Sequence, residues 1–234
     1  MFTYVLIHGA WHGGWCWSKL ESHLKVDKHH IIIPTLPFLS DSISLETHIE
    51  TVIQTIKSNK YNNLVLIGHS YAGMLLAPVA ECFHKHVRGL IYLDAVVPEK
   101  GQSFYNVFRN NNENYLQNMQ EDILQQKLID PPHPNEFGVT QDEDVKWMIS
   151  NLRPHPLKTF CDPILHSINK INEYPKLYIT CLKNNVDVFI KQKSKLSCKD
   201  GWWFQDIEES HDVMVTNPEM LSRLIKNFSY QIIQ

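Results

Sequence analysis

The chain has 234 residues, of which 43% are apolar and 20% are charged, and its formal net charge at pH 7 is −3. This balance is typical of a soluble globular protein rather than a disordered chain, and the small negative charge gives no reason to expect nucleic acid or an anionic membrane as a partner. No apolar run approaches the ~18 residues of a membrane span, and we see neither the cationic segment nor the cleavage site of a signal peptide.

The five cysteines argue against a disulfide framework, because their number is odd and no two of them form a Cys-x-x-Cys pair. The same scatter disfavours a structural zinc site. We therefore expect a cytoplasmic location, where thiols stay reduced. The cysteines are Cys16, Cys82, Cys161, Cys181 and Cys198.

Six short apolar runs predict buried β-strands. Most are rich in β-branched or aromatic residues and lack strict alternation, as expected for strands covered on both faces. Helical patterns lie between several runs, and the last helix begins at Asn217-Pro218, a capping residue followed by a proline. Strands that alternate with helices predict an α/β fold with a mostly parallel sheet. The runs are Tyr4–Ile7, Ile31–Ile33, Leu64–Ile67, Leu90–Leu93, Leu177–Cys181 and Trp202–Ile207, and one helical face is formed by Leu45, Ile49, Val52, Ile53 and Ile56.

The first run leads into the glycine-rich segment LIHGAWHGGW, residues 6–15. Glycines there let the backbone approach a substrate, and a free N–H can face a developing oxyanion. We assign that role to the backbone N–H groups of Ala10 and Tyr71. His8 and His12 resemble metal ligands, but no carboxylate or cysteine joins them locally, so we expect no metal.

The strongest signal is LVLIGHSYAG, residues 64–73, in which an apolar strand runs directly into Ser70 and an apolar helix follows. A strand-to-helix turn this sharp strains the serine, and large side chains two residues to either side would collide, which accounts for Gly68 and Ala72. The turn presents a hydroxyl next to the positive end of a helix. We therefore predict a nucleophile elbow with Ser70 as the nucleophile.

A serine nucleophile needs a general base, and in this chain order the base comes late. His211 follows the run Trp202–Ile207 and precedes the last helix. A histidine in a loop at the carboxyl end of a strand is well placed for this role. We predict His211 as the general base.

The acid that would orient His211 is predicted at the end of another strand. In the segment GLIYLDAVVP, residues 89–98, Asp94 ends an otherwise apolar run. Burying its carboxylate without a partner would be costly, and a histidine beside it supplies that partner. We predict that Asp94 accepts a hydrogen bond from His211. The alternative acid is Asp187, which follows the run Leu177–Cys181.

The interval from 98 to 163 is polar and rich in Asn, Gln and Pro, and it is far longer than the ~2–6 residues of a usual α/β connection. Weak helical patterns cover 113–130 and 141–152. We interpret 98–163 as a cap over the carboxyl ends of the strands, inserted into a core made of 1–97 and 164–234. Apolar residues predicted to line a substrate chamber, or else to hold the cap to the core, are Trp11, Phe104, Tyr105, Phe108, Tyr115, Trp147, Met148 and Phe160.

The segments LIHGAWHGGWCW, GHSYAG and YLDAVVP, together with the residues around His211, resemble the α/β-hydrolase superfamily, in the branch of plant methyl esterases, hydroxynitrile lyases and related bacterial esterases. The similarity spans essentially the whole chain and is weakest over 101–145. It implies an α/β-hydrolase fold with about six strands, an inserted cap and a Ser-His-acid mechanism without a cofactor. In the plant methyl esterases the acid coincides with Asn184, which cannot supply a negative charge. Some haloalkane dehalogenases hold their acid in a segment similar to YLDA, which favours Asp94.

The favoured function is hydrolysis of a small apolar carboxylic ester through an acyl-enzyme on Ser70. One alternative is a carbon–carbon lyase acting on cyanohydrins; the resembling lyases carry threonine at the position of Gly9 and lysine at the position of Asp212, and an acidic neighbour would disfavour a departing cyanide. The other is a non-enzymatic small-molecule receptor on a hydrolase scaffold. The sequence leaves open the natural ester and whether the chain forms a homodimer.

Overall fold

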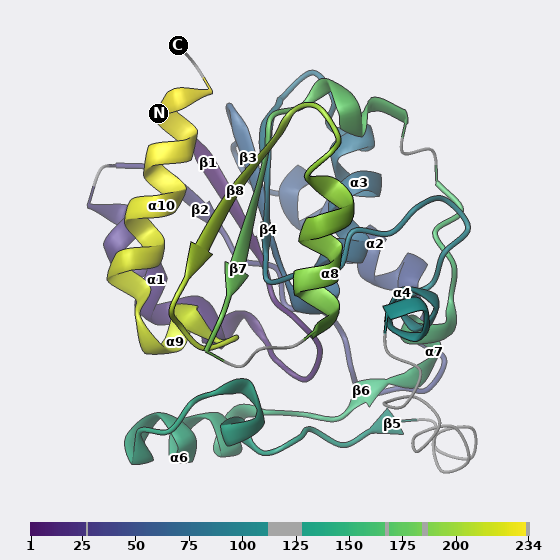
Figure 1. The fold of residues 1–234 in the computed structure, drawn as a ribbon, viewed down its shortest axis with the longest axis vertical. Coiled ribbons are helices and arrows are strands. Elements are labelled where there is room, and N and C mark those ends of the chain that lie inside the picture. The colour runs from purple at the N-terminus through teal and green to yellow at the C-terminus, as the bar shows by residue number, and fades with distance from the viewer. Residues whose placement is uncertain (27, 112–127, 167–168, 184–186, 233–234) are drawn as a thin grey trace.

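The computed structural model describes residues 1–26, 28–111, 128–166, 169–183 and 187–232. Its centre is a six-stranded sheet in which every neighbouring pair of strands is parallel, in the order β2-β1-β3-β4-β7-β8 (Figure 1). The predicted parallel sheet of about six strands is confirmed, and every predicted run overlaps an observed strand. The strands are β1 (Thr3–Ile7), β2 (His30–Ile32), β3 (Leu64–His69), β4 (Val87–Leu93), β7 (Lys176–Cys181) and β8 (Trp202–Ile207).

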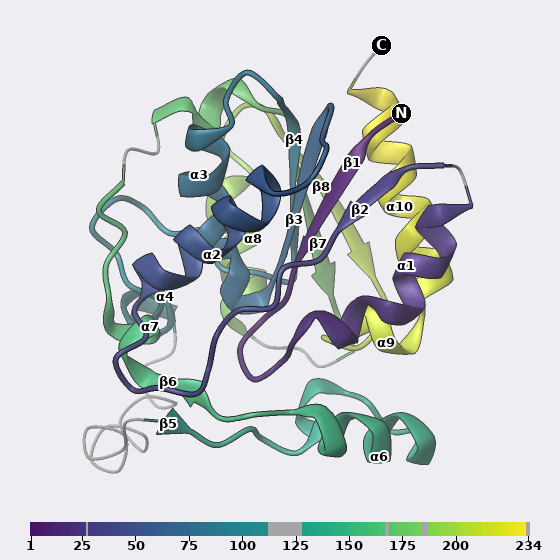
Figure 2. The same cartoon turned by 180° about the vertical axis from the view of Figure 1, so that it is seen from behind.

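Helices cover both faces of this sheet (Figures 1 and 2). In β3 every residue is buried; Leu66 packs into the apolar cluster on one face, while Val65 and Ile67 pack into the cluster on the other. Burial on both faces explains why the strand sequences lack polar alternation. One face carries α1 (Ser18–Lys25), α9 (Val213–Thr216) and α10 (Pro218–Gln231), and the other carries α2 (Leu45–Lys57), α3 (Gly73–Cys82) and α8 (Asp187–Leu196).

Local sequence fixes where two of these helices begin. The Ser44 side chain accepts a hydrogen bond from the Thr47 backbone N–H at 3.2 Å, which satisfies one of the free donors at the start of α2. Asn217 does the same for the Met220 N–H at 3.3 Å, with Pro218 in the first turn of α10. The predicted start of the last helix is therefore confirmed.

The segment between β4 and β7 supplies several short elements. Figure 1 shows that β5, β6 and α6 lie across the carboxyl ends of the sheet strands. This location agrees with our interpretation of 98–163, but the division into a cap (98–163) and a core (1–97 and 164–234) remains a proposal. The elements are α4 (Phe104–Asn111), β5 (Leu128–Ile129), η3 (Pro134–Phe137), α6 (Asp142–Asn151), β6 (His155–Pro156) and α7 (Leu157–Cys161).

The two helices predicted in this segment had different outcomes. The pattern over 141–152 corresponds to α6. Of the helix predicted over 113–130, residues 113–127 lie outside the described residues, and Leu128–Ile129 form a strand instead, because they pair antiparallel with His155–Pro156. Separately, none of the helices that the structure describes is long and apolar enough to span a membrane.

Candidate active site

Ser70 occupies the sharp turn between β3 and α3. Its backbone adopts φ +54°, a left-handed value that a non-glycine residue rarely takes, and its side chain remains partly exposed while Tyr71 beside it is buried. A Cβ atom added to Gly68 would lie 2.9 Å from the Ala72 carbonyl oxygen, so the turn requires glycine there. The strand, turn and helix predicted around Ser70 are all present in the structure.

Asp94 and His211 meet at the carboxyl edge of the sheet. His211 Nδ1 lies 2.6 Å from Asp94 Oδ2, and both side chains are buried. The second carboxylate oxygen, Oδ1, accepts a hydrogen bond from the Cys181 backbone N–H at 3.1 Å, on the neighbouring strand β7. Both oxygens of the carboxylate therefore have partners, which is what burial of this charge requires.

The tautomer of His211 follows from this contact. A carboxylate only accepts hydrogen bonds, so Nδ1 carries the proton and Nε2 is left with a lone pair. The imidazole stacks with Phe189 of α8 at a centroid distance of 5.2 Å and with Phe137 of η3 at 6.0 Å. Among the described residues no hydrogen bond joins Ser70 Oγ to His211. In enzymes without bound substrate, the hydrogen bond between nucleophile and base is often long and shortens only when substrate binds.

Asp187 is the first residue of α8, but its side chain belongs, with the whole of Asn184, to the part of the chain outside the described residues. Within the described part, Asp94 is the carboxylate that contacts the His211 ring.

The loop after β1 packs directly against the nucleophile turn. A Cβ atom added to Gly9 would lie 3.0 Å from both Ser70 Cβ and His69 Nδ1, so the glycine permits this close approach. Ala10 is buried next to it, and Trp11 adopts a left-handed φ of +64°. The backbone of residues 9–11 therefore lies beside Ser70, where the sequence predicts one half of an oxyanion hole.

The two histidines of this loop are held by protein atoms. His8 Nδ1 donates to the Gly9 carbonyl at 2.8 Å, and His8 Nε2 accepts from the Leu36 N–H at 3.0 Å. Burial lowers the pKa of His8 to about 3, so its ring is neutral. Among the described residues, no group of three or more His, Cys, Asp and Glu side chains is arranged to hold a metal ion.

His12 has a partner that the sequence analysis missed. Its Nε2 lies 3.2 Å from Asp212 Oδ2, and its Nδ1 lies 2.7 Å from the Ala10 carbonyl oxygen. Although burial raises the pKa of Asp212, the nearby His12 outweighs that effect and lowers the pKa to about 2. A buried carboxylate therefore stays ionised directly after His211. The nearest sequence signal is the acidic residue at position 212, but 200 positions separate it from His12.

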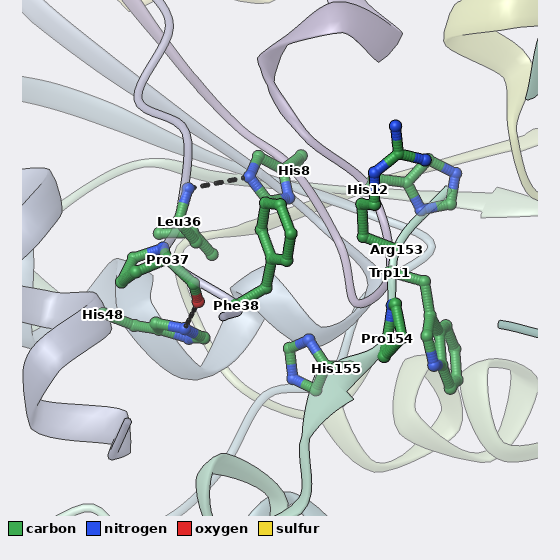
Figure 3. A pocket seen from close by; sticks show the side chains of 10 residues that line it. All are labelled: His8, Trp11, His12, Leu36, Pro37, Phe38, His48, Arg153, Pro154 and His155. Carbon is green, nitrogen blue, oxygen red and sulfur yellow. Dashed lines mark hydrogen bonds between the residues drawn. The ribbon is translucent and has the colours of Figure 1, made fainter. Parts of the chain in front are cut away.

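A small pocket opens between the loop after β1, residues 36–38 and residues 153–155, as Figure 3 shows. His48 of α2 borders it and connects it to the nucleophile turn: Tyr71 Oη donates to His48 Nδ1 at 3.0 Å, and His48 Nε2 donates to the Pro37 carbonyl at 2.9 Å. Burial lowers the pKa of His48 to about 4. The lining residues are His8, Trp11, His12, Leu36, Pro37, Phe38, His48, Arg153, Pro154 and His155.

The predicted chamber residues fall into two groups. Phe104 stacks on Phe160 at 4.4 Å and contacts Tyr71 at 5.8 Å, so these rings pack beside the nucleophile turn. Trp11 borders the pocket and its indole N–H donates to the Ile129 carbonyl at 3.0 Å, which joins the loop to β5.

Trp147 belongs to the second group. Its ring meets Trp15 edge-on at 5.0 Å, and Lys19 Nζ lies over it at 5.6 Å from the centroid. These contacts hold α6 against the core. Met148 is buried in the cluster on the same face as α1 and α10, and Tyr115 lies outside the described residues.

Comparison with known proteins identifies similar chains. The model of the alpha/beta hydrolase family matches residues 4–216. A carbendazim hydrolyzing esterase from Nocardioides sp. (strain SG-4G) is 29% identical over 95% of this chain and 97% of its own length. Methylesterase 10 from Arabidopsis thaliana is 26% identical over 97% of this chain and 91% of its own.

Among solved structures, an extracellular alpha/beta-hydrolase from a Paenibacillus species, described as sharing structural and functional homology with tobacco salicylic acid binding protein 2, is similar to this chain with a TM-score of 0.83. The two chains are 20% identical, and the match covers 97% of this chain and 98% of that one. This likeness shows a shared fold.

Proposed function

This chain belongs to the alpha/beta hydrolase family, and we propose that it is a serine hydrolase that cleaves small apolar carboxylic esters with Ser70, His211 and Asp94. The observation that carries the proposal is the 2.6 Å contact between His211 Nδ1 and Asp94 Oδ2 next to the strained Ser70 turn. The names of the two relatives, an esterase and a methylesterase, support ester hydrolysis as the reaction class.

The proposed reaction has two halves. Ser70 Oγ attacks the acyl carbon while His211 Nε2 takes its proton, and the Asp94 carboxylate stabilises the resulting imidazolium. The oxygen of the tetrahedral intermediate accepts hydrogen bonds from the Ala10 and Tyr71 N–H groups. His211 then returns the proton to the departing alcohol, which leaves an ester of Ser70. Water, deprotonated by His211, attacks that ester and releases the carboxylic acid.

The surroundings of Ser70 support an apolar substrate. Phe104, Phe160 and Tyr71 form a contiguous group of rings beside the turn, and Phe137 and Phe189 cover the His211 imidazole. Aromatic walls with few polar groups suit a compact aryl or short acyl group. We propose an ester or carbamate with a small alkoxy group, in keeping with relatives named for carbendazim hydrolysis and for methyl esters.

Gly9 and Asp212 disfavour the alternative function of a cyanohydrin lyase. A threonine at the position of Gly9 would place its Cβ 3.0 Å from Ser70 Cβ, so the turn in this chain is built around glycine. Asp212 occupies the place of the lysine in the resembling lyases, and it is fully buried against His12. A buried carboxylate would repel a departing cyanide rather than stabilise it.

The proposal is tested by trapping the nucleophile. A fluorophosphonate probe should add to Ser70, as identified by peptide mass mapping, and Ser70→Ala should lose about 10⁴- to 10⁶-fold in kcat on p-nitrophenyl acetate. The wild-type protein should turn over continuously in EDTA. A single burst without a steady state would point instead to the receptor alternative, and full labelling of the Ser70→Ala variant at another residue would contradict the assignment.

A further inference from the structure

A second buried charge pair lies next to the proposed triad. His12 Nε2 and Asp212 Oδ2 are 3.2 Å apart, and the two side chains are 2% and 0% exposed. Asp212 directly follows His211, whereas His12 belongs to the loop whose Ala10 N–H is proposed for the oxyanion hole. The proposed mechanism assigns no role to either residue.

The partners of His12 determine its charge. The Ala10 carbonyl oxygen only accepts hydrogen bonds, so the 2.7 Å contact requires a proton on His12 Nδ1. The ionised carboxylate of Asp212 likewise requires a proton on Nε2. His12 is thus an imidazolium. Although burial lowers the pKa of His12, the charge of Asp212 outweighs it and raises the pKa, in agreement with the hydrogen bonds.

The negative end of the pair points towards the general base. Asp212 Oδ1 lies 3.6 Å from His69 Nε2, and the same nitrogen donates to the His211 carbonyl oxygen at 3.0 Å. The rings of His69 and His211 are 4.4 Å apart. Because that Nε2 carries the proton and burial lowers the pKa of His69 well below its usual value, His69 is neutral. The Asp212 carboxylate therefore acts on His211 without a cation between them.

The positive end of the pair points towards the proposed oxyanion hole. The His12 Nδ1–H donates to the carbonyl of Ala10, the residue whose N–H would hold the oxyanion. In the tetrahedral intermediate a negative charge develops on the oxyanion and a positive charge on His211. The His12–Asp212 pair has its positive member on the loop that carries Ala10 and its negative member directly after His211.

We propose that His12 and Asp212 are positioning residues that favour the charge-separated tetrahedral intermediate through this preorganised dipole. The pair also fixes the loop of residues 8–12 relative to the loop of residues 208–212. The inference rests on the proposed function and deepens it. A charge fixed in a buried site stabilises a transition state strongly, because it needs no reorganisation when the reaction occurs.

Other titratable groups around the pair are neutral or peripheral. Burial and the charge of Asp212 raise the pKa of the Cys16 thiol on η1 (Gly14–Trp17) and the Cys181 thiol on β7 well above the usual value, so both stay protonated. Around His12, burial lowers the pKa of His8 to about 3 and that of His155 well below its usual value. Arg153 borders the same pocket as His12, but its side chain is exposed.

The test replaces the carboxylate of Asp212 with an amide, which removes the negative charge and keeps the shape of the side chain. Asp212→Asn should lower kcat about tenfold, since one of the two aligned charges next to His211 is lost. KM should stay within about twofold of wild type, because the Asp212 side chain is fully buried. The acid limb of the kcat/KM profile should move to lower pH by about half a unit to one unit, because protonation of His211 becomes less favourable without the neighbouring carboxylate.

A double variant separates electrostatics from packing. His12→Gln/Asp212→Asn removes both charges and retains a hydrogen-bonding pair, so it should lose at least as much kcat as Asp212→Asn. Kinetics are normalised to active protein by fluorophosphonate titration, which corrects for misfolded Asp212→Asn. The matched control is Asp206→Asn, an exposed aspartate on β8 that pairs with Lys193; it should match wild type in kcat and in the acid limb.

Two results would overturn the inference while leaving the proposed function intact. One is wild-type kcat per active site with an unmoved acid limb in Asp212→Asn. The other is full recovery of kcat in the double variant, which would mean that the pair serves only packing. Failure of the proposed function is a separate outcome, because then the wild-type protein itself would not hydrolyse p-nitrophenyl acetate and Ser70 would not be labelled.

Discussion

The proposed nucleophile and the proposed acid both adopt left-handed backbone conformations. Ser70 has φ +54° and Asp94 has φ +42°, and neither is a glycine. Such conformations cost about 1–3 kcal/mol each and persist only where the surroundings impose them. Here the Asp94 N–H donates to the Ile179 carbonyl at 2.8 Å, and the Val96 N–H donates to the Ser70 carbonyl at 3.2 Å. Asp94 is thus tied to β7, and Ser70 is tied to the loop that follows Asp94.

The left-handed conformations of Ser70 and Asp94 determine where their side chains point. A strand that continued in the usual direction would alternate its side chains between the two helix-covered faces. The left-handed turn directly after the strand instead presents the side chain beyond the carboxyl edge of the sheet. For Ser70 this exposes the hydroxyl, and for Asp94 it brings the carboxylate to His211 Nδ1. The proposed nucleophile and the proposed acid therefore share a left-handed backbone conformation at the ends of neighbouring strands.

At the scale of elements, the start of α3 packs against the loop that follows β4. A Cβ atom added to Gly73 would lie 1.9 Å from the Val96 carbonyl oxygen, a backbone atom that cannot move aside. The absence of a side chain at Gly73 lets the nucleophile helix approach the loop that carries Asp94.

We predict that Gly73→Ala lowers the free energy of unfolding by about 3 kcal/mol, because overpacking against a fixed backbone forces the helix and loop apart. Urea denaturation followed by tryptophan fluorescence measures the change. Gly89→Ala is the matched control: its Cβ would lie 2.8 Å from Phe228 Cε1, the far end of a side chain that can shift. Equal unfolding midpoints for Gly73→Ala and wild type would contradict the packing argument.

The sequence predicted most of the elements, for an identifiable reason. Strands buried on both faces leave apolar runs, so β3 and β7 could be located from composition alone. A short strand such as β5 leaves no such signal. Leu128–Ile129 is a strand only because His155–Pro156 pairs with it, and that partner lies more than 20 residues away. A local pattern cannot report such a pairing.

The same distinction separates the site residues that could be predicted from those that could not. Ser70 and Asp94 each end an apolar strand, so a polar residue there is locally conspicuous. The pairing of His12 with Asp212 has no local signature, because it joins two loops 200 positions apart. His48 sits one position before Ile49 on the buried face of an amphipathic helix, and its hydrogen bond to Tyr71 required the fold to be known.

At the scale of the whole molecule, neutral histidines are built into the interior. Burial lowers the pKa of His8 to about 3 and that of His48 to about 4, and burial lowers the pKa values of His69 and His155 as well. Below about pH 6.5 the unfolded chain binds protons at these histidines while the folded protein does not. Their stabilising contribution is therefore complete above pH 6.5 and is lost as the pH falls towards 4 and 3.

Within the charge pair, His12 has the opposite sign to these histidines, whereas Asp212 has the same sign at a lower pH. The raised pKa of His12 contributes stability below pH 6.5, and Asp212, with a pKa of about 2, contributes above its unfolded value near 3.8 and loses its contribution as the pH falls through 2. Between pH 6.5 and 4, neither of these two contributions is lost. The neutral histidines, which outnumber His12, dominate the change in the free energy of unfolding over that pH range.

We predict that lowering the pH from 7 to 5 reduces the free energy of unfolding by about 4 kcal/mol through His8 and His48 alone. Urea midpoints at the two pH values measure the change. His48→Gln should lose about 2 kcal/mol less over the same interval, because one of the two proton-binding differences is removed. A midpoint that does not change between pH 7 and 5 would show that these histidines are not held neutral.

We propose that Asp94, rather than a residue after β7, is the acid that orients His211. The most direct test of this proposal is the kcat of Asp94→Asn beside that of Asp187→Asn, measured on one p-nitrophenyl ester with active sites titrated. We expect Asp94→Asn to lose about 10⁴-fold in kcat, as triad aspartates do when the charge is removed and the shape is kept, and Asp187→Asn to stay near wild type. A large loss of kcat in Asp187→Asn together with an active Asp94→Asn would rule out Asp94 and return the acid to the segment after β7.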